Sequence, residues 1–334
     1  MAAPRVTVLT TLYNKGPFVE DAVRSILANS FTDFELLVVD DASTDDGPER
    51  VRAITDPRIR ILTSPTNTGR AAAANRGFDA ARGELIAVLD ADDVAHPERL
   101  AKQVAFLDAH PEIGAVGSYA QVIGQRDHVA QWPITDAEAR GLLLFEDPLL
   151  YGSAMFRRAV IQQGGLRCDE QWKWPGMDYL FLLDVIRACR VATIPEALTS
   201  YRIGEHNFRH GRDAVEDTAR ILREAFLHFA IEANEIDVRA HLFLLRRMGR
   251  SPNAEELRAL FAWVAKLRAF NKHAQVFTPH VLDARLEAEL AHWYYVLADT
   301  DASLARLHLR LSGRWPIGRL LYLVKSRART LLGR

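Results

Sequence analysis

Cysteine is scarce in this chain, and so are the apolar runs that cross membranes. Cys168 and Cys189 are the two cysteines among 334 residues. They are too few for a disulfide framework, and no close cysteine–histidine cluster suggests a zinc site. No segment approaches the ~18 consecutive apolar residues of a membrane span. The N-terminus also lacks a basic segment followed by a long apolar core, so we expect no signal peptide. These absences predict a cytoplasmic protein.

A surplus of charge of one sign is also missing. The 42 Lys and Arg residues nearly balance the 43 Asp and Glu residues, which leaves a formal net charge of −1. Such a chain has no general electrostatic attraction for a polyanion, so we expect no nucleic acid among its partners. The length of 334 residues predicts one large domain or two of ordinary size.

The first 120 residues contain an alternation of strand and helix patterns. Four strand patterns lie at 6–10, 34–41, 58–64 and 85–89, and the segments between them have the residue pattern of helices. Residues 36–39 and 85–89 are apolar at every position, as in strands that are buried on both faces. Ser43 is predicted to cap the short helix after the second strand. The alternation predicts an α/β fold with a doubly wound, mostly parallel sheet flanked by helices.

The pattern changes beyond the first 120 residues. A further strand is predicted over 113–124 and an apolar helix over 178–190. After residue 210 the chain is predicted to be mostly helical. One of its helices should begin at the capping pair Asn253 and Glu256, and another at Thr278. We therefore expect a domain boundary near residue 210.

Three carboxylates crowd together where a buried strand ends, because Asp90, Asp92 and Asp93 directly follow residues 85–89. In open α/β sheets, ligands bind outside the carboxyl ends of the strands. A hard cation such as Mg²⁺ or Mn²⁺ would remove the repulsion, and it usually takes further ligands from water and a substrate phosphate. The cluster therefore predicts a metal together with a phosphorylated ligand. The alternative is an ordinary strand-to-helix turn in which aspartate caps a helix.

Four segments in the same order resemble glycosyltransferase family 2. They read "VTVLTTLYN", "ELLVVDDASTDDG", "NTGRAAAANRGFDAARGELIAVLDADD" and "WPGMDYLFLLDVI", and the resemblance covers about residues 4 to 205. It implies a GT-A fold, with residues 1–210 as the catalytic domain. Residues 1–120 would bind the nucleotide-sugar and 121–210 the acceptor, and residues 211–334 would form a helical C-terminal extension. It also implies inverting transfer of a sugar from a nucleotide-sugar, with a UDP-sugar as the expected donor.

The resemblance further implies which residues contact the donor. Asp40 or Asp41 would accept hydrogen bonds from the base or ribose, since a carboxylate suits N–H and hydroxyl donors. Many relatives have an arginine where this chain has Ala74, and Arg70 or Arg76 can replace it. The full set of expected donor contacts is Thr10, Tyr13, Asn14, Asp40, Asp41, Asn67, Gly69, Arg70, Asn75 and Asp90.

The same resemblance implies the metal ligands and the base. Asp92 and Asp90 would hold Mg²⁺ or Mn²⁺, which stabilises negative charge on the leaving diphosphate. His206 would be a third metal ligand or a diphosphate contact, and the alternative is a solvated histidine in a loop. A carboxylate must take the proton of the acceptor hydroxyl during attack. Asp178 fills this role in the implied mechanism, although the family often has an acidic pair and Met177 stands in the first position here. The alternative for Asp178 is a carboxylate that stabilises the first turn of a helix.

The acceptor side is less defined by sequence. Gly152, Ser153 and Trp174 are candidates for lining an acceptor pocket, and a glycan or a lipid-linked glycan is the expected acceptor. Residues 306–334 contain eight Arg or Lys and no Asp or Glu, mixed with Leu and Trp. This mixture suits the surface of an anionic membrane, which predicts a peripheral location at the inner face of the cell membrane. The alternative is an amphipathic helix that packs on the catalytic domain.

Two functions of different classes remain. The first is a metal-dependent glycosyltransferase in the synthesis of bacterial cell-envelope polysaccharide or lipopolysaccharide. The second is a catalytically inactive module of the same fold that binds a sugar nucleotide or a glycan. The intact aspartate cluster argues for the enzyme, and the reduced acidic pair at Met177 and Asp178 argues mildly for the module.

Overall fold

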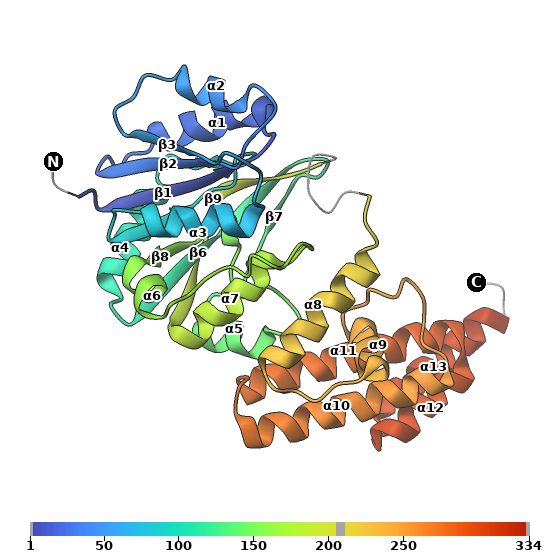
Figure 1. Cartoon of the computed structure of the whole chain (residues 1–334). Helices are drawn as coiled ribbons and strands as arrows, with labels where there is room; N and C mark the ends of the chain where they lie inside the picture. Colours follow the sequence, from blue (N-terminus) through green and yellow to red (C-terminus); the bar gives the residue numbers. More distant parts are fainter. Residues whose placement is uncertain (1–2, 205–210, 332–334) are drawn as a thin grey trace. The chain divides into compact units, whose positions relative to one another are not determined.

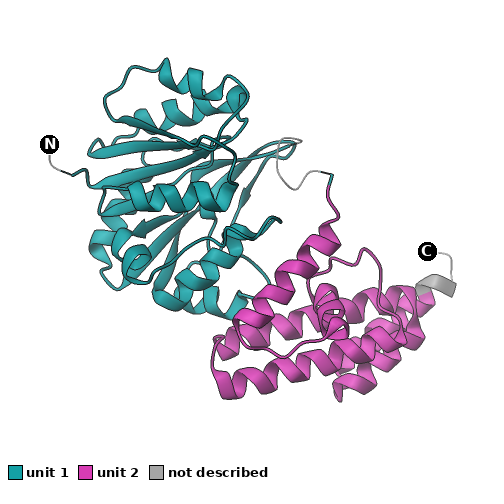
Figure 2. Ribbon diagram, viewed as in Figure 1, with its two compact units in different colours: residues 1–211 teal, residues 212–334 magenta. Residues whose placement is uncertain are grey.

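The computed structural model describes residues 3–204 and 211–331, with side chains described to residue 328. The chain divides into two compact units, residues 1–211 and 212–334 (Figure 2). Unit 1 has a mixed α/β architecture and unit 2 is helical (Figure 1). Each unit has its own set of buried apolar residues.

Unit 1 is built on one sheet, whose strands follow the order β3-β2-β1-β4-β8-β6-β9-β5, with β7 paired to β6. Its first four strands are parallel to one another, and they match the four predicted strands: β1 (Val6–Leu12), β2 (Phe34–Asp40), β3 (Ile59–Thr63) and β4 (Leu85–Val88). The prediction of a parallel sheet is therefore confirmed for this half.

The other half of the sheet is mixed. Its strands are β5 (Val94–Ala95), β6 (Ile113–Gly124), β7 (His128–Ala130), β8 (Met155–Arg157) and β9 (Arg190–Ile203). The short β8 inserts between β4 and β6 and runs antiparallel to both. β9 is parallel to β6 and antiparallel to β5. A three-residue strand gives little periodic signal, which is why the sequence did not predict the insertion of β8.

Helices cover both faces of the parallel half (Figure 1). Val6, Val8 and Leu12 of β1 belong to an apolar cluster that includes residues of α1 and α4. Leu9 faces the other side, where α3 approaches so closely that a Cβ on Gly77 would lie 2.2 Å from Leu9 Cδ1. The helices of unit 1 are α1 (Gly16–Leu27), α2 (Gly47–Arg52), α3 (Arg70–Ala80), α4 (Arg99–Ala109), α5 (Asp136–Leu142), α6 (Arg158–Gln163) and α7 (Met177–Ala188), with a 3₁₀ turn η1 at Tyr151–Ser153.

Unit 2 consists of α8 (Ala214–His228), α9 (Glu235–Leu244), α10 (Ala254–Ala274), α11 (Pro279–Thr300), α12 (Ala302–Ser312) and α13 (Ile317–Leu331). Buried aromatic side chains such as Phe226, Phe243 and Trp263 form its core. The predicted capping box of Asn253 and Glu256 is confirmed at α10. Thr278 precedes α11 as expected, but its side chain makes no capping hydrogen bond. Among the described residues no helix is both long and apolar enough to cross a membrane.

The register of the parallel strands brings three loops to one edge of the sheet. Leu12 is opposite Asp40, and Leu9 is opposite Val88. The segments that follow β1, β2 and β4 therefore leave the sheet at the same edge. This is the edge where open α/β sheets bind their ligands.

Candidate active site

The loops after β1 and β2 are tied together through Asn14. Its backbone N–H donates to Ser43 Oγ at 3.2 Å, and its Oδ1 accepts from Thr44 N at 2.8 Å. Asn14 has a φ of 52°, a left-handed conformation that asparagine tolerates better than most residues. The prediction that Ser43 caps a helix is wrong, because α2 begins after Asp46 and Ser43 is used in this loop contact.

Asp40 and Asp41 are adjacent in the sequence, but their carboxylates make different hydrogen bonds. Both oxygens of Asp41 are engaged: Oδ1 accepts from Thr68 N and Oγ1 at 2.9 and 2.7 Å, and Oδ2 accepts from Gly69 N at 2.7 Å. Asn67 donates to the Asp41 carbonyl at 3.3 Å. Asp41 thus fixes the loop that leads into α3. Asp40 accepts from Ser43 N at Oδ1, and both carboxylates are buried. Of the two, Asp40 is the better candidate for a base or ribose.

Asn75, an expected donor contact, is occupied within the protein. It is 5% exposed, its Nδ2 donates to Cys168 O and Glu170 Oε1, and its Oδ1 accepts from Cys168 N, all at 2.9 Å. An amide with its donors and acceptor committed in this way holds the loop around residue 168 in place. We therefore assign Asn75 a positioning role.

Of the two arginines that could replace the missing one at Ala74, Arg70 is directed at the acidic cluster. It lies close enough to Asp90 to lower the pKa of that carboxyl. Arg76 instead donates to Ser64 Oγ and to Thr63 O. Ala74 itself is buried, with 1% exposure. Arg70, at the first turn of α3, is therefore the better candidate for a diphosphate contact.

Asp90 and Asp92 form the acidic centre of this edge. Burial raises the pKa of Asp90 to about 6, and the charges of Asp92 and Asp178 add to the effect, while Arg70 and Lys15 oppose it. Asp92 Oδ2 lies 2.5 Å from Lys15 Nζ, so a lysine from the loop after β1 neutralises this carboxylate. The two aspartates predicted to bind the metal thus lie close enough to interact electrostatically. Two basic side chains, Lys15 and Arg70, compensate their charge.

Asp93 belongs to the framework of the site. It is 1% exposed, and its Oδ1 accepts from Arg202 N at 2.8 Å. Arg202 Nε in turn donates to the Asp92 carbonyl at 2.9 Å. Burial, with the nearby charge of Asp90, raises the pKa of Asp93 well above its usual range. Asp93 therefore joins the acidic turn to β9.

Sequence reasoning missed Arg99, which lies beneath the acidic turn. Arg99 is 0% exposed, its Nη2 donates to Val88 O at 2.6 Å, and its Nε donates to Gln103 Oε1 at 3.1 Å. Burial lowers the pKa of Arg99 to about 10, whereas the charges of Asp93 and Asp90 raise it. It is a buried positive charge that partly compensates these carboxylates. An arginine in the first turn after an acidic cluster is the signal that could have identified it.

The backbone of Gly152 lies close to Asp90 and Asp93, whereas the Ser153 hydroxyl bonds to other parts of the fold. A Cβ on Gly152 would lie 3.0 Å from Asp90 Oδ2 and 3.4 Å from Asp93 Oδ2, so a larger residue would crowd both carboxylates. Ser153 is 0% exposed and donates to Leu150 O at 2.9 Å. The expectation that Ser153 lines an acceptor pocket is therefore wrong, because its hydroxyl is committed inside the fold.

Asp178, the predicted base, is brought to the same edge by α7. Gly176 precedes the helix with a φ of 91°, which glycine adopts without strain. Asp178 is half-buried, its Oδ1 accepts from Tyr179 N at 3.0 Å, and its charge raises the pKa of Asp90. Met177 is buried, with 6% exposure. Three carboxylates, Asp90, Asp92 and Asp178, therefore share one electrostatic site.

Within the described residues, the predicted metal ligands are two carboxylates, Asp90 and Asp92. Among residues 3–204 and 211–331, no three His, Cys, Asp or Glu side chains are grouped as a metal cage. His206, predicted as a third ligand, lies outside the described residues. The donor set of Asp90 and Asp92 still fits Mg²⁺ or Mn²⁺, because such ions often take one or two carboxylates and complete their shell with water and phosphate.

The remaining donor candidates, Thr10 and Tyr13, lie at the end of β1. Thr10 is 1% exposed and pairs with Val38 in the sheet, whereas the Tyr13 side chain is 44% exposed. Tyr13 therefore presents an aromatic surface at the edge where the loops meet. Gly69, the last donor candidate of this edge, precedes α3 with a φ of 95°.

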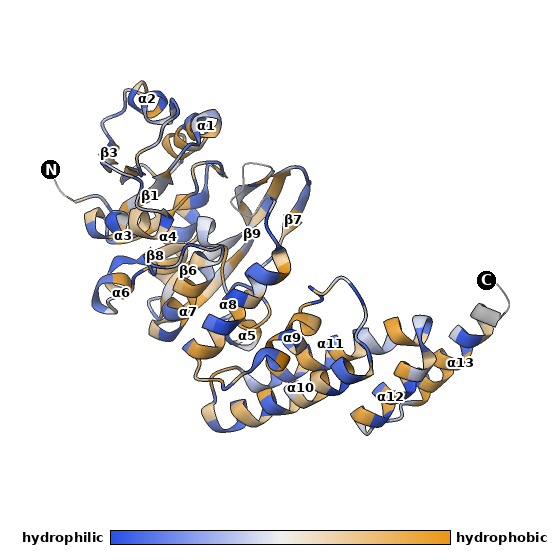
Figure 3. Ribbon diagram, turned by 45° about the vertical axis from the view of Figure 1, so that its right-hand side comes forward, coloured by the Kyte–Doolittle hydropathy of each residue, from blue (hydrophilic) through white to orange (hydrophobic). Residues whose placement is uncertain are grey.

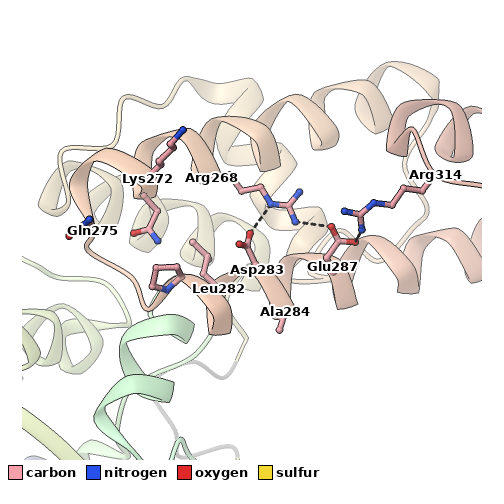
Figure 4. A pocket seen from close by; sticks show the side chains of 10 residues that line it. Arg268, Lys272, Gln275, Leu282, Asp283, Ala284, Glu287 and Arg314 are labelled. Carbon is pink, nitrogen blue, oxygen red and sulfur yellow. Dashed lines mark hydrogen bonds and ion pairs between the residues drawn. The ribbon is translucent and has the colours of Figure 1, made fainter.

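A groove of about 820 Å³ in unit 2 is a weaker candidate for a ligand site. Its charged side chains pair with one another: Arg268 donates to Asp283 and Glu287, each at 2.8 Å (Figure 4). Arg314 lies 3.6 Å from the second oxygen of Glu287. Since acids of the same groove already compensate these arginines, the groove does not favour an anionic ligand.

Replacing Asp90 by Asn should stabilise the metal-free protein at pH 8 and leave its stability nearly unchanged at pH 4. The folded-state pKa of Asp90, about 6, lies above the unfolded value. A raised carboxyl pKa means that ionisation destabilises the fold, an effect absent below about pH 4 and complete above about pH 7. We expect a gain of about 1–3 kcal/mol at pH 8, measured by urea unfolding in EDTA.

Asp33→Asn is the matched control, because Asp33 is exposed and is not one of the residues of the site. It should change stability little at either pH. A loss of stability for Asp90→Asn at pH 8, or an effect that does not depend on pH, would contradict the electrostatic account of the site.

The chain is similar to known glycosyltransferases. The family model described as glycosyl transferase family 2 matches residues 7–165. The succinoglycan biosynthesis protein ExoO of Rhizobium meliloti is 32% identical over 252 residues, which cover 71% of this chain and 69% of the relative. The uncharacterized glycosyltransferase alr2836 of Nostoc sp. is 31% identical over 232 residues, which cover 64% of this chain and 69% of the relative.

Solved structures share the fold. TarS of S. aureus in complex with UDP-GlcNAc has a TM-score of 0.61 and 18% identity, covering 85% of this chain and 91% of that one. The mannosyltransferase PcManGT of Pyrobaculum calidifontis, in complex with GDP-Man and Mn²⁺, has a TM-score of 0.51 and 22% identity, covering 100% and 89%. The fold of the chain is thus GT-A, as expected from the sequence. The chain belongs to glycosyltransferase family 2.

Proposed function

We propose that this glycosyltransferase moves a sugar from a nucleotide-sugar, most readily a UDP-sugar, to a hydroxyl of a glycan or lipid-linked acceptor, with inversion. The setting we propose is bacterial cell-envelope polysaccharide synthesis in the cytoplasm, at the inner face of the cell membrane. The observation that carries the proposal is the shared electrostatic site of Asp90, Asp92 and Asp178 at the carboxyl edge of the sheet. ExoO, a succinoglycan biosynthesis protein, supports the choice of pathway class.

The donor half of the proposal rests on the loops after β1 and β2. Asp40 would accept hydrogen bonds from the base or ribose, and Tyr13 offers an exposed ring in the loop after β1. Asp41 would act indirectly, by fixing the loop at Thr68 and Gly69. The complexes of TarS with UDP-GlcNAc and of PcManGT with GDP-Man support a nucleotide-sugar donor.

Asp90 and Asp92 would hold a divalent cation, for which the Mn²⁺ complex of PcManGT is a precedent within the fold. When bound, Mg²⁺ or Mn²⁺ supplies positive charge that stabilises the leaving diphosphate. The chain adds its own charge at the same place, since Arg70 and Lys15 both act on Asp90. These side chains would bind and orient the diphosphate before and during bond breaking.

Asp178 would take the proton from the acceptor hydroxyl as that oxygen attacks the anomeric carbon. Inversion by direct displacement needs the base on the side of the sugar opposite the leaving diphosphate. Asp178 comes from α7, whereas Asp92 and Lys15 follow β4 and β1, so the base and the diphosphate contacts come from different elements. The inactive binding module stays the second candidate, since Met177 replaces one acid of the family's pair.

Asp178→Asn should retain donor binding and lose sugar transfer. The amide keeps the size of the side chain but does not take a proton at neutral pH, so the chemical step should slow by roughly 10²–10⁴-fold. Release of UDP from a UDP-sugar with Mn²⁺ gives the rate, and a thermal shift with UDP gives binding.

Asp184→Asn, on the same helix, is the control for a general effect on α7. It should transfer sugar at close to the wild-type rate. Normal transfer by Asp178→Asn would show that another group is the base. No turnover by the wild-type protein with any nucleotide-sugar, despite tight metal-dependent binding, would favour the binding module.

Lys15→Met should bind Mn²⁺ more tightly than the wild-type protein in the absence of nucleotide. Lys15 neutralises Asp92 at 2.5 Å, so a cation must displace the ammonium group before it reaches this carboxylate. We expect a gain of roughly 3–10-fold in affinity, in line with one partly exposed charge pair. Isothermal titration or the electron paramagnetic resonance signal of free Mn²⁺ measures it.

The control for this variant is Lys102→Met, which removes a lysine paired with Glu196 on the surface of unit 1. Its Mn²⁺ affinity should equal that of the wild-type protein. An unchanged or weaker affinity for Lys15→Met would mean that Asp92 does not contact the metal.

A further inference from the structure

The last helix of the chain, α13, has two apolar sides. One side is packed on α11: Leu323 is 8% exposed, and Ser326 Oγ donates to Ala298 O at 3.0 Å. Tyr322 OH donates to Asp299 Oδ2 at 2.8 Å, and its ring lies 4.9 Å from that of Tyr295. These contacts fix the rotation of α13 about its own axis. The direction in which its other side faces is therefore determined.

The other side presents large apolar residues to solvent. Ile317, Leu321 and Val324 are 75%, 55% and 67% exposed, and their spacing of four and three residues places them on one face of the helix. Trp315, just before the helix, is 52% exposed. Figure 3 colours α13 with alternating hydrophobic and hydrophilic segments. Exposed apolar residues gathered in this way mark an interaction surface more often than isolated ones do.

Basic residues flank this apolar face, and acidic residues are absent from the sequence after Asp301. Lys325 and Arg327 are exposed, and they fall on opposite sides of the strip formed by Ile317, Leu321 and Val324 at 100° per residue. Long basic side chains in this position can extend past an apolar surface and keep their charge in the polar layer. The charge pattern therefore complements an anionic surface.

We propose that Trp315 and the exposed face of α13 dock on an anionic lipid bilayer, with Lys325 and Arg327 contacting the headgroups. An amphipathic helix of this kind lies in the interface, with its apolar face among the upper acyl chains. A second copy of the chain is a poorer occupant. A two-fold contact through the same face would bring its basic flanks together. The proposal extends the proposed function, because it brings the enzyme to lipid-linked acceptors, but it is tested without any transfer reaction.

The test is co-sedimentation of the full-length protein with vesicles at low salt and at about 0.5 M NaCl. Vesicles of phosphatidylcholine are compared with vesicles in which about one third of the lipid is phosphatidylglycerol. We expect binding to the anionic vesicles at low salt and its loss at high salt or without phosphatidylglycerol. The triple variant Ile317→Ser/Leu321→Ser/Val324→Ser should bind roughly tenfold more weakly or not at all.

Two further variants separate this surface from a general effect. Leu227→Ser/Ile236→Ser removes apolar residues of similar exposure, 71% and 63%, on α8 and α9, and it should bind like the wild-type protein. Lys325→Gln/Arg327→Gln should bind more weakly and depend less on salt. All variants should keep the wild-type unfolding temperature, since the replaced side chains are exposed.

Three outcomes would overturn the proposal. The first is wild-type protein that stays in the supernatant with anionic vesicles at low salt. The second is equal loss of binding for the triple variant and for Leu227→Ser/Ile236→Ser. The third is a wild-type dimer, seen by light scattering, that the triple variant converts to a monomer, because this face would then bind a second copy. UDP-sugar hydrolysis, measured in parallel, should be the same for all variants, so failure here leaves the proposed reaction untouched.

Discussion

Asp90 and Asp92 stand next to each other where β4 leaves a sheet that is buried on both faces, and burial makes two adjacent negative charges costly. The rest of the site compensates this charge. Lys15 pairs with Asp92, Arg70 acts on Asp90 from the start of α3, and Arg99 acts on Asp93 and Asp90 as a buried cation. We infer that a divalent ion and the donor's diphosphate complete this compensation during the reaction. The buried negative charge at this turn lowers the stability of the fold, and the same arrangement prepares the turn to bind a cation and a phosphate.

The aspartates of this edge show how one residue type takes different roles. Both oxygens of Asp41 accept from the loop before α3, and Asp93 Oδ1 accepts from Arg202 N in β9, so these two aspartates link separate segments of the chain. Asp40, Asp92 and Asp178 are the aspartates proposed to meet the donor, the metal and the acceptor. The partners of these carboxylates, which cannot be read from sequence, assign Asp41 and Asp93 to the framework of the site.

Much of this was predictable from sequence because the signals are local. Continuous apolar runs such as residues 36–39 identified buried parallel strands, and the crowding of Asp90 and Asp92 identified the acidic centre. The choice between Asp40 and Asp41, the use of Asn75 to hold a loop 93 residues away, and the burial of Arg99 depend on tertiary contacts. The insertion of β8 was also missed, since three residues carry too little pattern. The roles of these residues depend on where they lie in the fold and how deeply they are buried, more than on residue type.

If cation and diphosphate bind together at Asp90 and Asp92, the binding of each must strengthen the binding of the other, and coupled titration measures this. The affinity for UDP is measured by isothermal titration in EDTA and in saturating Mn²⁺, with wild-type protein and Asp92→Asn. The account predicts that Mn²⁺ strengthens UDP binding by at least about tenfold in the wild-type protein, and that this coupling disappears in Asp92→Asn. Equal UDP affinity with and without Mn²⁺ in the wild-type protein would contradict it.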